Sequence, residues 1–153
     1  MKQTNTRSVP PAIVLYVEDE ETDTIFMRMA FERAGLGDSL KVIADGRQAI
    51  AYLAGEGVYK DRIQYPMPAV VVLDLNLPIV PGFGVLDWIR EQGALRNLPV
   101  IIFSSSDFDE DRANARVHGA NDYMEKPTSG LEFRTLVLRL KDRWLKGGGC
   151  STR

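Results

Sequence analysis

Acidic side chains directly follow two of the most apolar runs in the sequence. Asp74 comes after the run 70–73, and Glu18 and Asp19 come after the run 12–17. An apolar run without alternation is typical of a strand buried on both faces of a parallel sheet. Reacting groups and ligands gather outside the carboxyl ends of such strands. Taken alone, however, Asp74 could be an ordinary turn or helix-capping aspartate, and Glu18 and Asp19 a solvated helix start.

The elements that must position these residues alternate along the chain. Strands are predicted over 12–17, 40–44, 70–73, 99–103 and 121–124, and an amphipathic helical segment follows each one, the last over 129–145. This alternation predicts an α/β fold, a doubly wound five-stranded parallel sheet with five helices and right-handed crossovers.

The predicted helices carry apolar faces that must pack on the sheet. In the first helix the spacing predicts that Ile25, Phe26, Met29 and Ala30 form the buried face. In the last helix the predicted stripe comprises Phe133, Leu136, Val137, Leu140 and Trp144. Asp107 is predicted to cap the fourth helix, because three acidic residues follow it at 109–111.

Length and composition indicate a single globular domain. The chain has 153 residues, a formal net charge of -2 and one cysteine, Cys150. This charge balance disfavours a nucleic-acid-binding protein, and one cysteine allows no internal disulfide. With no signal-like or membrane-spanning apolar run, we expect a soluble, cytoplasmic protein without membrane contact. The tails, residues 1–11 and 147–153, are predicted to be flexible, which leaves a folded domain over 12–146.

The carboxyl ends of the predicted strands bring distant polar residues to one edge of the sheet. Glu18, Asp19 and Asp74 would crowd together there, and two unit charges ~4 Å apart repel by about 4 kcal/mol at an effective dielectric near 20. A divalent cation removes that cost, and oxygen ligands favour Mg²⁺. The predicted ligands are the carboxylates of Asp19 and Asp74, the backbone carbonyl of Asn76, and Glu18 through water.

The central carboxylate and a lysine suggest phosphoryl transfer. Carboxylates are established nucleophiles that form aspartyl phosphates, and Asp74 is the most central of the three. Mg²⁺ and the Lys126 ammonium would neutralise charge on the transferring group. Lys126 could instead be an ordinary surface lysine.

Five motifs in order make the chain resemble the receiver domains of two-component response regulators, with the phytochrome-associated single-domain regulators as the nearest likeness. These motifs are Glu18-Asp19, Asp74, Ser104, Tyr123 and Lys126-Pro127. The resemblance covers about residues 12–145 and implies a flavodoxin-like fold with strand order 2-1-3-4-5. Pro81-Gly82 departs from the family's usual Asp-Gly.

The resemblance also implies a function. Asp74 would accept a phosphoryl group from a sensor histidine kinase, with a kinase of phytochrome type as one candidate and Mg²⁺ as cofactor. Ser104 and Tyr123 would form the switch that changes the face made by the fourth helix, fifth strand and fifth helix. From the residues alone, Ser105 or Ser106 could equally cap the next helix, and Tyr123 could be a half-buried strand aromatic. The family further suggests a cis Lys126–Pro127 bond.

A second apolar row on the last helix suggests a contact surface. Leu131, Leu138 and Leu145 recur at seven-residue spacing beside basic residues, as in a helix-pairing seam. The row could mediate a homodimer or partner contact, or it could merely widen the core stripe. Because the sequence ends soon after this helix, we expect output through protein contact.

Three other functions compete with this interpretation. An aspartyl-phosphate phosphatase would need an acid two residues after the nucleophile, where this chain has Asn76. A flavin- or nucleotide-binding domain would need a phosphate loop after the first strand, where acidic residues at 18–21 repel phosphate. An unphosphorylated interaction module would not need the complete set of site residues. We therefore expect a phosphoacceptor and not an enzyme, although phosphorylation from small donors and slow self-dephosphorylation are expected.

Overall fold

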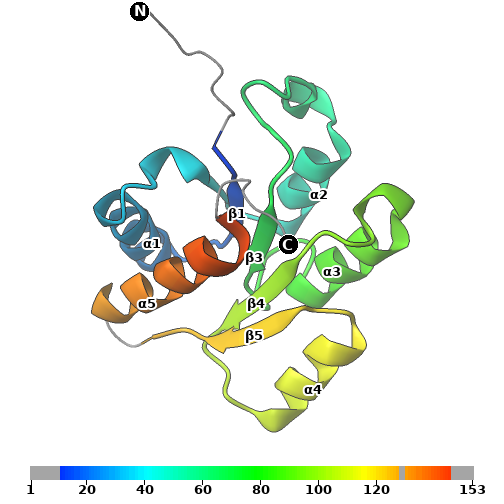
Figure 1. Ribbon diagram of the computed structural model, residues 1–153. Helices are drawn as coiled ribbons and strands as arrows, with labels where there is room; N and C mark the ends of the chain where they lie inside the picture. The colour runs from blue at the N-terminus through cyan, green and yellow to red at the C-terminus, as the bar shows by residue number, and fades with distance from the viewer. Residues whose placement is uncertain (1–10, 128–129, 146–153) are drawn as a thin grey trace, which may run out of the picture.

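Five parallel strands form one sheet at the centre of the molecule (Figure 1). The computed structural model describes residues 11–127 and 130–145, and for residues 130–132 it describes the backbone alone. The strands are β1 (Val14–Val17), β2 (Leu40–Ile43), β3 (Val70–Leu73), β4 (Val100–Ser104) and β5 (Asp122–Glu125). They lie in the order β2-β1-β3-β4-β5, and every neighbouring pair is parallel. The predicted fold class and strand order are therefore confirmed.

In the described part of the chain, four α-helices lie between successive strands and a fifth follows β5. They are α1 (Glu21–Arg33), α2 (Gly46–Ala54), α3 (Gly82–Glu91), α4 (Asp109–Val117) and α5 (Gly130–Leu140). Three short 3₁₀ turns, η1 (Gly37–Ser39), η2 (Gly57–Lys60) and η3 (Gly93–Leu95), lie in the connections, and a π-helical turn, η4 (Lys141–Leu145), continues α5. The described ranges cover nearly all of the predicted domain, whereas the predicted flexible tails lie outside the described residues except for Pro11.

The helices bury both faces of the sheet (Figure 1). On one face, α1 and α5 pack over strand residues such as Tyr16 and Phe103, and on the other, α2, α3 and α4 pack over Leu15 and Ile102. Successive strand residues point to opposite faces, so strands buried on both sides must be apolar throughout. This explains the unbroken apolar runs, and it leaves the strand ends as the place where polar side chains gather.

The buried face of α1 differs from the predicted one. Met27, Ala30 and Phe31 are buried, whereas Ile25 and Met29 are 49% and 39% exposed. The prediction is therefore right for Ala30 and for Phe26, which packs partly buried against the core, and wrong for Ile25 and Met29. Because α1 packs on both the sheet and α5, its most buried residues, Met27 and Phe31, form a row rotated from the predicted one. The stripe predicted for the last helix is correct, since its members from Phe133 to Leu140 are buried.

The start of α4 also differs from the prediction. The helix begins at Asp109 with Phe108 in the capping position, not at Asp107. Phe108 has an extended backbone, and the Ser106 hydroxyl accepts a hydrogen bond from its N–H at 3.3 Å, so the helix begins only after Phe108. None of the helices within the described ranges combines the length and the apolar character that crossing a membrane requires.

Candidate functional site

The candidate site is built on backbone hydrogen bonds that extend the sheet one residue beyond its strands. The N–H of Glu18, just after β1, donates to the Ile43 carbonyl at 2.9 Å. The N–H of Asp74, just after β3, donates to the Val17 carbonyl at 3.2 Å. Because these bonds hold the residues to neighbouring strands, Glu18 and Asp74 lie next to each other at one edge of the sheet.

Three carboxylates converge at this edge. Glu18, Asp19 and Asp74 each offer an oxygen, and these oxygens all lie within 4.8 Å of one another. Glu18 and Asp74 are buried, with 1% and 3% exposure, whereas Asp19 is exposed. The three carboxylates therefore lie together, as expected from their positions at the strand ends. The cluster is buried at Glu18 and Asp74 and open to solvent at Asp19.

The Lys126 ammonium reaches the same cluster from the end of β5. The Lys126 backbone N–H donates to the Ser104 carbonyl at 2.7 Å, which fixes the residue beside β4. Its Nζ lies 2.7 Å from Glu18 Oε1, 2.9 Å from Asp23 Oδ2 and 3.5 Å from Asp74 Oδ2. Burial lowers the pKa of this ammonium, but the hydrogen bonds to Glu18 and Asp23 outweigh burial and hold the pKa above its ordinary value. The lysine is therefore a fixed positive charge within the cluster.

Glu18 bears a clear electrostatic cost in this cluster. Burial and the charge of Asp74 raise its pKa to about 7, although the Lys126 ammonium opposes the shift. Its oxygens accept hydrogen bonds from the Tyr16 hydroxyl at 3.0 Å and from the Glu20 backbone N–H at 3.2 Å. Two buried carboxylates and one lysine thus leave a surplus of negative charge at the site.

The donor set fits a hard divalent cation. It consists of carboxylate oxygens, which Mg²⁺ prefers, and its surplus negative charge is what a cation would neutralise. Asp19 and Asp74 are the carboxylates best placed to hold it directly. Glu18 is already engaged by Tyr16, Glu20 and Lys126, which suits contact with the ion through water.

The loop after Asp74 folds back tightly onto it. The Gly82 N–H donates to the Leu75 carbonyl at 3.0 Å, and a Cβ atom at Gly82 would lie 2.3 Å from the Asp74 carbonyl oxygen. Within the loop, Ile79 has a φ of 72°, a conformation that non-glycine residues rarely adopt. Asn76 is exposed in this loop, and its predicted role as a backbone ligand stays a prediction.

Ser104 and Tyr123 are joined through Ser106. The buried Ser104 hydroxyl accepts a hydrogen bond from the Ser106 N–H at 3.2 Å, and the Tyr123 hydroxyl donates to the Ser106 carbonyl at 2.8 Å. The Ser106 hydroxyl also bonds the Asp111 carboxylate in α4, and the Arg112 guanidinium lies 4.7 Å from the centre of the Tyr123 ring. A continuous set of contacts therefore links the end of β4 to α4 and β5.

The expected cis bond before Pro127 is not found. No peptide bond among the described residues is cis, so the Lys126–Pro127 bond is trans. The expectation came from the family and not from the residues, and the trans isomer is the one that an X–Pro bond favours by about 0.5–1 kcal/mol.

The three leucines predicted to form a seam on α5 have different surroundings. Leu138 is 46% exposed, whereas Leu145 is half-buried and packs against the core beneath α1 and α5. The side chain of Leu131 lies outside the described residues. Of the two leucines of the row whose side chains the structure describes, Leu138 is the exposed one, and the interface itself stays a prediction.

Two residues of the site were missed by the sequence interpretation, Asp23 and Tyr16. The first contacts Lys126 and the second contacts Glu18. A signal for Asp23 existed, because it stands four residues before the buried Met27 and residues four apart share a helix face. The incorrect choice of buried face for α1 concealed it. Tyr16 lies within an apolar run, and nothing in the sequence pattern indicates that its hydroxyl would reach Glu18.

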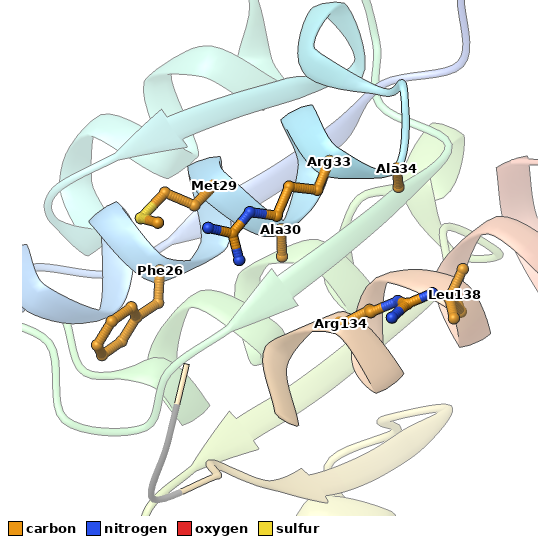
Figure 2. Close-up of a pocket in the computed structure, with 7 residues that line it drawn as sticks. All are labelled: Phe26, Met29, Ala30, Arg33, Ala34, Arg134 and Leu138. Carbon is orange, nitrogen blue, oxygen red and sulfur yellow. The ribbon is translucent and has the colours of Figure 1, made fainter. Parts of the chain in front are cut away.

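A separate cavity of about 570 Å³ lies between α1 and α5. Figure 2 shows residues that line it, among them Phe26, Met29 and Arg33 on α1 and Arg134 and Leu138 on α5. None of the residues that line it belongs to the acidic cluster, so the cavity is distinct from the candidate site.

Comparison with known proteins identifies the family. The model of the response regulator receiver domain matches residues 14–138. The probable methanogenesis regulatory protein FilR2 of Methanothrix harundinacea is 35% identical over 136 residues, which are 88% of this chain and 84% of that protein. The response regulator Rcp1 of Synechocystis is 28% identical over 139 residues, which are 91% of this chain and 92% of that protein.

Solved structures agree with this assignment. The Mn²⁺-bound form of Rcp1 aligns with a TM-score of 0.78 at 26% identity, covering 93% of this chain and 100% of that one. The phosphorylated cyanobacterial phytochrome response regulator RcpA aligns with a TM-score of 0.81 at 26% identity, covering 93% of this chain and 99% of that one. From its residues 14–138, its sheet order and these relatives, this chain belongs to the response regulator receiver family.

Proposed function

We propose that this chain is a single-domain response regulator whose Asp74 accepts a phosphoryl group from a sensor histidine kinase in a Mg²⁺-dependent reaction. The observation that carries the proposal is the convergence of a buried acceptor carboxylate, two further carboxylates and one lysine. Similarity to the phosphorylated regulator RcpA and the Mn²⁺-bound form of Rcp1 supports it. The likeness to RcpA also supports a kinase of phytochrome type as the donor.

In the proposed reaction an Asp74 carboxylate oxygen attacks the phosphorus of a phosphohistidine. The new O–P bond forms as the P–N bond breaks, and the electron pair of that bond stays on the imidazole, which takes up a proton. A bound Mg²⁺ would neutralise charge on the phosphoryl oxygens, with Asp19 and Asp74 as its direct carboxylate ligands. Lys126 lies 3.5 Å from Asp74 and would pair with a phosphoryl oxygen of the product.

The proposed switch begins at Ser104. A phosphoryl group adds charge of about -1.5 to -2 and strong acceptor oxygens, which would draw the Ser104 hydroxyl towards Asp74. The hydrogen bond from the Ser106 N–H to that hydroxyl would then break, and the contact between Ser106 and Tyr123 would change with it. The equilibrium would shift only by the difference in contacts that the phosphoryl group makes in the two states.

For output we propose contact with a partner or a second copy through α5, with Leu138 at its centre. Leu138 is exposed, in contrast to Leu145, the other member of the predicted row whose side chain is described. Leu138→Arg would then weaken self-association in sedimentation or binding to the kinase, and if it left both unchanged the proposed surface would be wrong. We expect the protein to act in the cytoplasm, where receiver domains usually meet their kinases.

The experiment is incubation with a small phosphodonor, followed by measurement of intact mass. With Mg²⁺, the unmodified chain is expected to gain one phosphoryl group, and Asp74→Asn and an EDTA-treated sample are expected to gain none. Serine or threonine phosphorylation would persist in Asp74→Asn, so that outcome, or no gain at all, would refute the proposal.

A further inference from the structure

The Lys126 ammonium is shared unequally among three carboxylates. Its nitrogen lies 2.7 Å from Glu18 and 2.9 Å from Asp23, but 3.5 Å from Asp74. An ammonium has three N–H donors, and N–H···O hydrogen bonds are typically no longer than about 3.2 Å. Its two short contacts are therefore made to Glu18 and Asp23, and the residue proposed to accept phosphorus receives the longest one.

Asp23 approaches the lysine from a different element than the other carboxylates. It is the third residue of α1 and lies 103 residues before Lys126 in the sequence. Its side chain is 23% exposed and that of Lys126 is 10% exposed, so the pair is largely shielded from water. Because Met27, one turn further along α1, is buried against the sheet, the helix holds the Asp23 carboxylate in a fixed position.

We propose that Asp23 is a positioning residue for phosphoryl transfer, which holds the Lys126 ammonium apart from Asp74 until a phosphoryl group arrives. This inference rests on the proposed function. With Asp23 and Glu18 as anchors, the Asp74 oxygens remain available for a cation and for attack on phosphorus. When the phosphoryl group is in place, the third donor of the ammonium can bond one of its oxygens without movement of the lysine chain.

Removal of Asp23 should let the lysine settle on the acceptor. One donor would lose its partner, and the nearest remaining carboxylate that is not already in short contact is Asp74. An ammonium bonded closely to Asp74 would compete with the cation and with phosphorus for the same oxygens. For comparison, partners that orient metal ligands typically contribute about 10–100-fold to activity or metal affinity.

The alternative is that Asp23 acts only by adding negative charge near the site. Glu21 offers a matched control, because it lies in the same first turn of α1, is exposed, and has no contact with Lys126 among those described. Glu21→Gln removes the same charge as Asp23→Asn with the same change of group. A difference between the two variants therefore isolates the contact with Lys126.

The test is the rate of phosphorylation by a small phosphodonor at saturating Mg²⁺, measured by intact mass on the full chain. Asp23→Asn and Asp23→Ala should lower this rate about ten-fold or more, Asp23→Glu should restore part of it, and Glu21→Gln should leave it unchanged. In a Lys126→Ala background, Asp23→Asn should cause no further loss. Circular dichroism and urea unfolding identify any variant that fails to fold.

Two results would overturn the inference while leaving the proposed function intact. One is a rate for Asp23→Asn equal to that of Glu21→Gln, and the other is an undiminished effect of Asp23→Asn when Lys126 is already alanine. Failure of the unmodified chain to accept any phosphoryl group would instead overturn the proposed function, and this inference with it.

Discussion

Substitution of Gly82 by alanine should disturb the acceptor aspartate through its backbone. The added Cβ would lie 2.3 Å from the Asp74 carbonyl oxygen and 2.7 Å from Leu75 Cα. Both neighbours are main-chain atoms, so no side chain can rotate away, and either the start of α3 or the end of β3 must move. Overpacking of this kind costs about 1–3 kcal/mol, and the gain from alanine over glycine in a helix offsets at most about 1 kcal/mol of it.

Taking a cost of about 3 kcal/mol and the full offset of about 1 kcal/mol, we expect Gly82→Ala to lower the free energy of unfolding by about 2 kcal/mol. Phosphorylation should also slow, because a displacement of about 1 Å at a reacting group can cost about 100-fold in rate. Gly93→Ala is the matched control. A Cβ there meets nothing within 4 Å, and the residue is not buried, so its stability should stay equal or rise by up to about 1 kcal/mol.

Urea unfolding measures the first effect, and intact mass after exposure to a small phosphodonor measures the second. If Gly82→Ala were as stable as Gly93→Ala and accepted phosphate at the same rate, the close contact between the loop and Asp74 would not exist in solution. Loss of stability without loss of phosphorylation would indicate that α3 moves and Asp74 does not.

The stability of the fold should also depend on the protonation of Glu18 and on the hydrogen bonds of Arg90. The pKa of Glu18 is about 7 in the fold against an ordinary 4.5, so the folded chain keeps a proton that the unfolded chain releases; the stability this proton contributes is complete below pH 4.5 and is lost as the pH rises through about 7. In EDTA, the unmodified chain should therefore lose stability relative to Glu18→Gln as the pH rises from about 4.5 to about 8, and a constant difference in unfolding free energy would contradict this. Arg90 donates to three backbone carbonyls and to Asn121 Oδ1 at 2.8–3.1 Å, a fork that an ammonium cannot reproduce. Arg90→Lys should lower the urea midpoint by an amount equivalent to about 2–3 kcal/mol with the slope unchanged, and an unaltered midpoint would refute this role.

The sheet could be predicted from the sequence because burial on both faces leaves a strong signal. Runs such as 70–73 must be apolar throughout, and the residue that follows each run must be where the chain leaves the core. This is why Asp74 and the Glu18-Asp19 pair could be assigned to one edge of the sheet from the sequence alone. The family resemblance then supplied the strand order.

The contacts that complete the site were harder to predict because they depend on tertiary packing. Asp23 contacts Lys126 because α1 is oriented with Met27 towards the sheet. The apolar residues at 25, 26, 29 and 30 were also compatible with a different rotation of the helix about its axis. The Tyr16 hydroxyl donates a hydrogen bond to Glu18 at the end of the same strand. Tyr16 lies within an apolar run in which every residue is expected to be buried, so the sequence pattern gave no reason to expect a polar contact from it. Similarly, α4 begins after Phe108 and not after Asp107 because of a loop conformation that no periodicity encodes.

The central claim is that the Asp74 carboxylate forms a bond to phosphorus, and locating the phosphoryl group tests it most directly. The chain is treated with a small phosphodonor and Mg²⁺, the acyl phosphate is reduced with borohydride, and the peptides are sequenced by mass spectrometry. We predict that homoserine appears at position 74 and at no other aspartate, and that EDTA abolishes it. Reduction at Asp19 or Asp23 instead, or a phosphoryl group that resists borohydride on a hydroxyl side chain, would contradict the account.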